Sequence, residues 1–148
     1  MAISFNDFLI LSERDMKSCT LFEAEFPDEY AVSTAMYHME QAIEKQLKAL
    51  LLLNGEEPPC TNDIRRLMQK CAEFTVLPAE LDIVADSLTL WESKTRYDPY
   101  IVFSRTQYDL AKRAYGEIKE NLNEILMEYS NAEQNEEEFT DERSYPRR

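Results

Sequence analysis

Between Val32 and Leu51 the apolar residues recur at steps of three and four, the spacing that places side chains on one face of an α-helix. Polar residues recur at the same spacing on the other face. The pattern predicts one long amphipathic helix ending at Asn54-Gly55, because glycine fits the left-handed conformation that closes many helices. The predicted apolar stripe consists of Val32, Ala35, Met36, Met39, Ile43, Leu47, Leu50 and Leu51, and the polar face includes Gln41, Glu44, Lys45 and Lys48.

The chain is poor in turn-forming residues. It has only two glycines and six prolines in 148 residues, whereas a sheet protein of this size would need many turns. No predicted helix carries a proline in its interior. We therefore predict an all-α fold, an antiparallel up-and-down bundle of four to five helices. Besides the helix that ends at Asn54, the pattern predicts helices over residues 4–24, 61–74, 78 to before 99, and 104–130.

Two predicted helix starts carry the spacing of a capping box, in which the side chains of the cap and of the third helical residue each bond the other's backbone N–H. Ser4 and Asp7 form the first pair, and Ser104 and Gln107 form the second. The helix over residues 61–74 is expected to begin at Thr61 or Asn62. Pro78 suits the first turn of the following helix, because proline is tolerated there.

Near Asn131 the chain becomes strongly acidic, with six Asp or Glu residues before the terminal Arg147-Arg148. We predict two parts: a helical bundle over residues 1–130 and an acidic, flexible tail over residues 131–148.

The acidic character extends over the whole chain, whose formal net charge is −13. Such a charge repels polyanions and disfavours broad, salt-driven nucleic-acid binding. An acidic protein–protein interaction module is therefore one interpretation. Cys19, Cys60 and Cys71 are odd in number and lack metal-ligand spacing, which indicates reduced thiols in a cytoplasmic protein. No apolar run approaches membrane-spanning length, so we expect no membrane association.

The loop between the last two predicted helices holds the strongest ligand-binding candidates, Arg96, Tyr97 and Tyr100. Arginine can hold a phosphate with two hydrogen bonds, and the tyrosines can stack on a base. Arg96 can equally satisfy carbonyls at a helix end or pair with Asp98. The two interpretations stay open.

On the long central helix, Gln41, Lys45 and Lys48 could grip an anion or a partner. A solvated or interface face is the alternative, because Glu44 and Lys48 have the spacing of a favourable ion pair. His38 is the only histidine, and without a recognisable sequence partner we interpret it as structural. The chain lacks a glycine-rich phosphate loop and the paired Glu-x-x-His motifs of a di-iron bundle. We therefore expect neither cofactor nor metal.

Taken together, these motifs resemble the HEPN family of small helical domains. Its hallmark helix is similar to Tyr37-His38-x-Glu40-Gln41-Ala42-x-Glu44-Lys45-x-Leu47-Lys48-Ala49-Leu50. Its Gly-x-x-Pro loop is similar to residues 55–58, and its Arg-Tyr-Pro-like element to Thr95-Arg96-Tyr97. Its alanine-rich last helix is similar to the segment with Ala111 and Ala114. The resemblance spans residues 8–128.

The resemblance implies a homodimer that binds a nucleotide or pairs with a minimal nucleotidyltransferase. Some members are toxin-type, metal-independent ribonucleases whose arginine is followed, after four to six residues, by a histidine. Here no histidine follows Arg96, and Asn62 replaces a histidine common in the short helix. We therefore expect a non-catalytic domain. The alternative is a ribonuclease in which Arg96 binds phosphate and Tyr97 or His38 assists.

Overall fold

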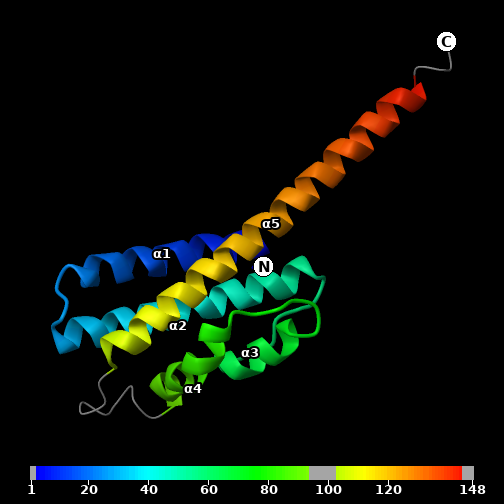
Figure 1. The fold of residues 1–148 in the computed structure, drawn as a ribbon. Coiled ribbons are helices and arrows are strands. Elements are labelled where there is room, and N and C mark those ends of the chain that lie inside the picture. The colour runs from blue at the N-terminus through cyan, green and yellow to red at the C-terminus, as the bar shows by residue number, and fades with distance from the viewer. Residues whose placement is uncertain (1–2, 94–102, 145–148) are drawn as a thin grey trace. The chain divides into compact units, whose positions relative to one another are not determined.

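The computed structural model describes residues 3–93 and 103–144. This part of the chain contains five helices and no strand: α1 (Phe5–Glu23), α2 (Glu29–Leu53), α3 (Ile64–Cys71), α4 (Ala79–Ser93) and α5 (Arg105–Ser144). Figure 1 shows α1 and α2 running antiparallel, with α3 and α4 on the side of α2 away from α1. The all-α bundle predicted from the sequence is confirmed.

The chain divides into two compact units, residues 1–118 and residues 119–148, and α5 contributes residues to both. The first unit contains α1 to α4 and the first part of α5. The second contains the rest of α5. The predicted division into a bundle over residues 1–130 and a flexible tail over residues 131–148 stays a prediction.

The helix α2 forms the centre of the first unit. Every residue of its predicted apolar stripe is buried, from Val32 to Leu51. Buried side chains of the other helices complete the core of this unit: Cys19 of α1, Ile64 and Leu67 of α3, Leu81, Val84 and Leu88 of α4, and Tyr108, Ala111, Ala114 and Ile118 of α5. Because other elements surround α2, its polar side chains lie against protein as well as solvent.

The predicted capping boxes are both present. Asp7 N–H donates to Ser4 Oγ at 3.2 Å, and Ser4 N–H donates to Asp7 Oδ2 at 3.1 Å. At α5, Gln107 N–H donates to Ser104 Oγ at 3.2 Å, and Ser104 N–H donates to Gln107 Oε1 at 2.9 Å. The helix α4 begins at Ala79, so Pro78, predicted to lie in its first turn, directly precedes it.

Three predicted helix boundaries are wrong: both ends of α3 and the end of α5. The helix α3 spans only Ile64–Cys71, because Asp63 caps it by accepting from Arg66 N–H at 3.3 Å, so neither Thr61 nor Asn62 is the cap. The helix α5 continues past the predicted end at residue 130 to Ser144. Residues 131–144 include five Glu, which favour helix, and contain neither glycine nor proline to end it.

No helix in the described part of the chain is both long enough and apolar enough to cross a bilayer. Cys19, Cys60 and Cys71 are all free thiols. Burial raises the pKa of Cys19 and of Cys71 to about 12, so these two thiols stay protonated at neutral pH. Cys60 lies exposed in the loop between α2 and α3.

The two glycines of the chain should respond in opposite directions to replacement by alanine. Gly55 follows the cap of α2 with φ of 76°, so Gly55→Ala should lower the free energy of unfolding by about 1–2 kcal/mol. A Cβ added at Gly116, inside α5, meets nothing within 4 Å. Gly116→Ala should therefore raise that free energy by about 0.5–1 kcal/mol. Urea unfolding followed by circular dichroism measures both, and changes of the same sign would contradict the prediction.

Candidate functional site

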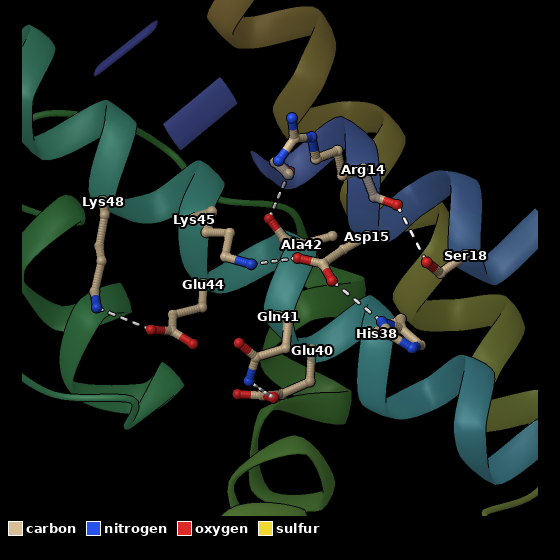
Figure 2. Close-up of polar contacts among 11 residues, drawn as sticks. Arg14, Asp15, Ser18, His38, Glu40, Gln41, Ala42, Glu44, Lys45 and Lys48 are labelled. Carbon is tan, nitrogen blue, oxygen red and sulfur yellow. Dashed lines mark hydrogen bonds and ion pairs between the residues drawn. The ribbon is translucent and has the colours of Figure 1, made fainter. Parts of the chain in front are cut away.

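The residues predicted from the sequence fall into two groups. Arg96, Tyr97 and Tyr100 lie outside the described residues, so their phosphate-binding and stacking roles stay predictions. Gln41, Lys45 and Lys48 all lie on α2, on the side that Figure 2 shows. The described site is therefore the polar side of α2 together with the α1 residues that face it.

Asp15 of α1 links two α2 side chains. Its Oδ1 lies 3.1 Å from His38 Nδ1, and its Oδ2 accepts a hydrogen bond from Lys45 Nζ (Figure 2). The three side chains are only 15% (Asp15), 26% (His38) and 21% (Lys45) exposed. We call Asp15, His38 and Lys45 the Asp15 clamp, because one carboxylate joins α1 to two turns of α2.

The surroundings of His38 fix its ring. Phe22 stacks on it with ring centres 6.0 Å apart, and Tyr37 meets it edge-on at 5.2 Å. Because a carboxylate only accepts hydrogen bonds, Asp15 selects the form of the imidazole that carries a proton on Nδ1. In this neutral form the other ring nitrogen, Nε2, has a free lone pair, and it makes the ring an imidazolium when it accepts a proton. A histidine held in this way is positioned as a general base.

The sequence does not predict that Asp15 is the partner of His38. The two residues are 23 positions apart and belong to different helices. Their pairing depends on the register between antiparallel α1 and α2, for which the sequence carries no local signal.

The predicted pair of Glu44 and Lys48 is present, with Lys48 Nζ donating to Glu44 Oε1 at 2.8 Å. This pair does not lie on a solvated face, because the side chains are only 7% (Glu44) and 14% (Lys48) exposed. The other carboxylate oxygen, Glu44 Oε2, is buried without a hydrogen-bond partner in the described structure. Keeping Lys48 beside this carboxylate compensates a charge that would be costly to bury alone.

The side chain of Gln41 is also paired with a carboxylate of this chain. Its Nε2 donates to Oε2 of the buried Glu40 at 2.8 Å. Each of the three α2 side chains predicted to bind a ligand thus donates to a carboxylate of this chain: Gln41 to Glu40, Lys45 to Asp15 and Lys48 to Glu44. The arrangement neutralises both lysines within the domain.

A second set of polar contacts holds α1 and α5 against α2. Ser12 Oγ donates to the Ala42 carbonyl at 2.7 Å, and Gln46 Nε2 donates to the Tyr115 carbonyl at 3.0 Å. Tyr115 in turn donates its hydroxyl to Glu13 at 3.0 Å, and burial raises the pKa of this hydroxyl. These contacts fix the register in which Asp15 meets His38 and Lys45.

The described residues offer no group of three or more His, Cys, Asp or Glu side chains arranged to hold a metal ion. The candidate site is thus a set of paired charges on α2 with one oriented histidine.

Replacing Asp15 by asparagine should destabilise the domain, because the change keeps the side-chain volume but leaves half-buried Lys45 without its counter-charge. We expect Asp15→Asn to lower the free energy of unfolding by about 1–3 kcal/mol in urea unfolding. Asp109→Asn is the matched control, since Asp109 is 45% exposed where it pairs with Arg105 on α5. That change should cost less than about 0.5 kcal/mol. Equal losses in the two variants would mean that the Asp15 clamp does not stabilise the domain.

Comparison with known proteins gives one family. The model of the HEPN domain matches residues 13–138. The crystal structure of ST0689, an archaeal HEPN homologue, resembles this chain with a TM-score of 0.59 and 21% sequence identity, over 86% of this chain and 98% of the homologue. At this identity the likeness shows the fold alone. No curated protein matches the chain. Because the family model spans well over half of the sequence, as the resemblance of its motifs predicted, this protein belongs to the HEPN domain family.

Proposed function

We propose that this HEPN domain is non-catalytic and acts by binding a partner protein, and that it does so as a homodimer. The partner that the family implies is a minimal nucleotidyltransferase. The single observation that supports this proposal most is the internal pairing of the cations on α2. Lys45 and Lys48 already donate to Asp15 and Glu44, so the positive charge of each ammonium group is compensated inside the domain and attracts a phosphate less strongly.

The electrostatics of the chain favour a protein partner over a nucleotide. A nucleotide brings several negative charges to a protein whose own net charge is −13. A phosphate bound at Lys48 would compete for its positive charge with the buried carboxylate of Glu44, which is 5% exposed. A protein partner can contribute cationic side chains, for which the acidic surface is attractive at long range.

Nucleotides should therefore leave the thermal stability of the protein unchanged, whereas the partner should raise it. A ligand present at 100 times its Kd stabilises by about 2.7 kcal/mol, which corresponds to a shift of several degrees in Tm. We expect millimolar ATP or GTP to give no shift. A minimal nucleotidyltransferase from the same genome should co-purify with the tagged chain at a fixed ratio. A clear ATP-dependent shift that Arg96→Ala abolishes and Lys48→Ala leaves intact would replace this proposal by nucleotide binding at the Arg96 loop.

The Asp15–His38 contact specifically favours a second candidate function, metal-independent RNA cleavage. General-base catalysis at a ribose hydroxyl needs a base whose orientation is fixed, and Asp15 fixes the ring of His38. In this alternative Arg96 binds the phosphate. Arg96 is not among the described residues, so its distance from His38 is not given.

Cleavage of a labelled RNA pool in the presence of a chelator separates the two candidates. For a non-catalytic domain we expect no cleavage by the wild type. For a ribonuclease we expect cleavage that falls at least about 100-fold in both His38→Ala and Arg96→Ala, the usual scale of a lost general base. Arg66→Ala, at an exposed arginine of α3, is the control and should keep full activity. Cleavage that persists in all three variants would point to a contaminating nuclease and leave the binding proposal in place.

A further inference from the structure

The last part of α5 carries a dense negative charge without any counter-charge of its own. Nine Asp or Glu residues lie between Glu120 and Glu142, both included, and no Lys, Arg or His lies among them. At about 1.5 Å per residue these residues extend about 34 Å, so they carry about one negative charge per 4 Å of helix axis. A single nucleic-acid strand carries one charge per about 3.4 Å. We call residues 120–142 the acidic α5 segment.

The acidic α5 segment is helical although its charges oppose a helix. Figure 1 shows α5 as one continuous helix through it. Glu120, Glu124 and Glu128 follow one another at steps of four, the spacing at which like charges repel on a helix. Asp141 and Glu142 lie in the last turn of α5, where the helix dipole disfavours negative charge. The intrinsic preference of Glu for helix acts against both effects.

Packing within the chain gives this part of α5 little support. Each of residues 127–134 is exposed, and eight residues make more than two helical turns, so every side of α5 is accessible there. Between residues 120 and 134 only Leu122 is buried. Most helices in proteins are stabilised by an apolar face packed against the rest of the fold. Over these two turns the acidic α5 segment lacks such a face.

One side of the acidic α5 segment combines regular charges with an apolar side chain. Glu124 lies four residues after Glu120 and four before Glu128, and Met127 lies three residues after Glu124, so the four share one side of the helix. All four are exposed, Met127 at 66%. A methionine adapts its shape to the surface it meets. Such a side suits a helix that lies in a groove of another protein.

The groove that fits the acidic α5 segment is basic with an apolar floor. Lys and Arg side chains along the groove would remove the repulsion among the carboxylates, and the floor would cover Met127. Small cations could neutralise the charge but offer no surface for the methionine. Grooves that bind single-stranded nucleic acids place positive charge along the path of the strand and apolar or aromatic surface beneath it. The linear charge density of the segment is close to that of such a strand.

We infer that the acidic α5 segment docks into a basic groove of a partner protein, in the place of a nucleic-acid strand. The inference rests on the proposed function, which requires a protein partner, and it specifies the surface that binds this partner. It also adds a consequence. While the chain is bound, the groove is closed to nucleic acid, so the domain acts as a competitive inhibitor of nucleic-acid binding.

Removal of charge from the exposed row tests the docking surface. Isothermal titration calorimetry measures the affinity of the full chain for two probes, the minimal nucleotidyltransferase of the proposed function and an oligolysine peptide. A triple variant with Glu120→Gln, Glu124→Gln and Glu128→Gln should bind each probe at least about tenfold more weakly, because three opposite-charge contacts are lost. Glutamine favours helix as well as glutamate does, so circular dichroism should show unchanged helix content.

A second triple variant is the matched control. Glu25→Gln, Glu57→Gln and Glu73→Gln change the net charge by the same amount at exposed acids of the first unit. This variant should bind both probes within about twofold of the wild type, since the loss of net charge alone acts only at long range and is screened by salt. Equal losses in the two triple variants would mean that the chain attracts cations as a whole and would overturn the inference.

Two further measurements test the nature of the groove. Met127→Ala should weaken binding of the nucleotidyltransferase about fivefold, because apolar contact is lost, and should leave oligolysine binding unchanged. Oligouridylate, a single-stranded RNA, should displace the wild-type chain from the nucleotidyltransferase. A complex that persists at saturating RNA would overturn the competition with nucleic acid.

The outcomes separate the acidic α5 segment from the wider proposal. A nucleotidyltransferase that binds the wild type and both triple variants equally would overturn the segment as docking surface and leave the proposed function in place. A nucleotidyltransferase that does not bind the wild type would overturn the proposed partner. The oligolysine series then decides the inference by itself. Selective loss in the Glu120, Glu124 and Glu128 variant supports a different basic partner, and equal affinities overturn the segment.

Discussion

The structure depends most on the burial of α2. Its apolar stripe lies entirely inside the first unit, and parts of its polar side are buried as well, with Glu40 at 1% and Glu44 at 5% exposed. A carboxylate withdrawn from water must be compensated nearby, because an isolated buried charge costs several kcal/mol. Lys48 provides that compensation for Glu44 from the next turn of the same helix. The charge pairs on the polar side of α2 are therefore required by the fold itself, whether or not a ligand binds.

The same constraint supports the binding function proposed above. Side chains that could have formed an anion site are used inside the domain, where they hold α1 to α2 and balance buried acids. The oriented imidazole of His38 is the one described group whose geometry also suits chemistry.

The sequence predicted those parts of the structure that depend on neighbours along the chain. Apolar periodicity located the helices, and the pairs Ser4–Asp7 and Ser104–Gln107 marked two of their starts, because a capping box involves residues only three apart. The predicted helix boundaries were wrong where more than one residue could begin or end the helix. Asp63 caps α3 although Thr61 and Asn62 were equally plausible from the sequence. The acidic composition after residue 130 suggested a tail, yet the same residues are good helix formers and α5 continues through them.

The sequence by itself therefore determined the fold class, the helix that forms the centre of the core, and the pairing of Glu44 with Lys48. The first follows from the scarcity of turn-forming residues, and the other two follow from spacing within one helix. Only the tertiary structure decided which polar residues of α2 are buried. It also decided that Asp15 joins His38 and Lys45 across 23 and 30 positions of the chain. The physical reason is that a contact between helices depends on their register and direction. Those are fixed by the summed packing of the whole core, and no local pattern encodes them.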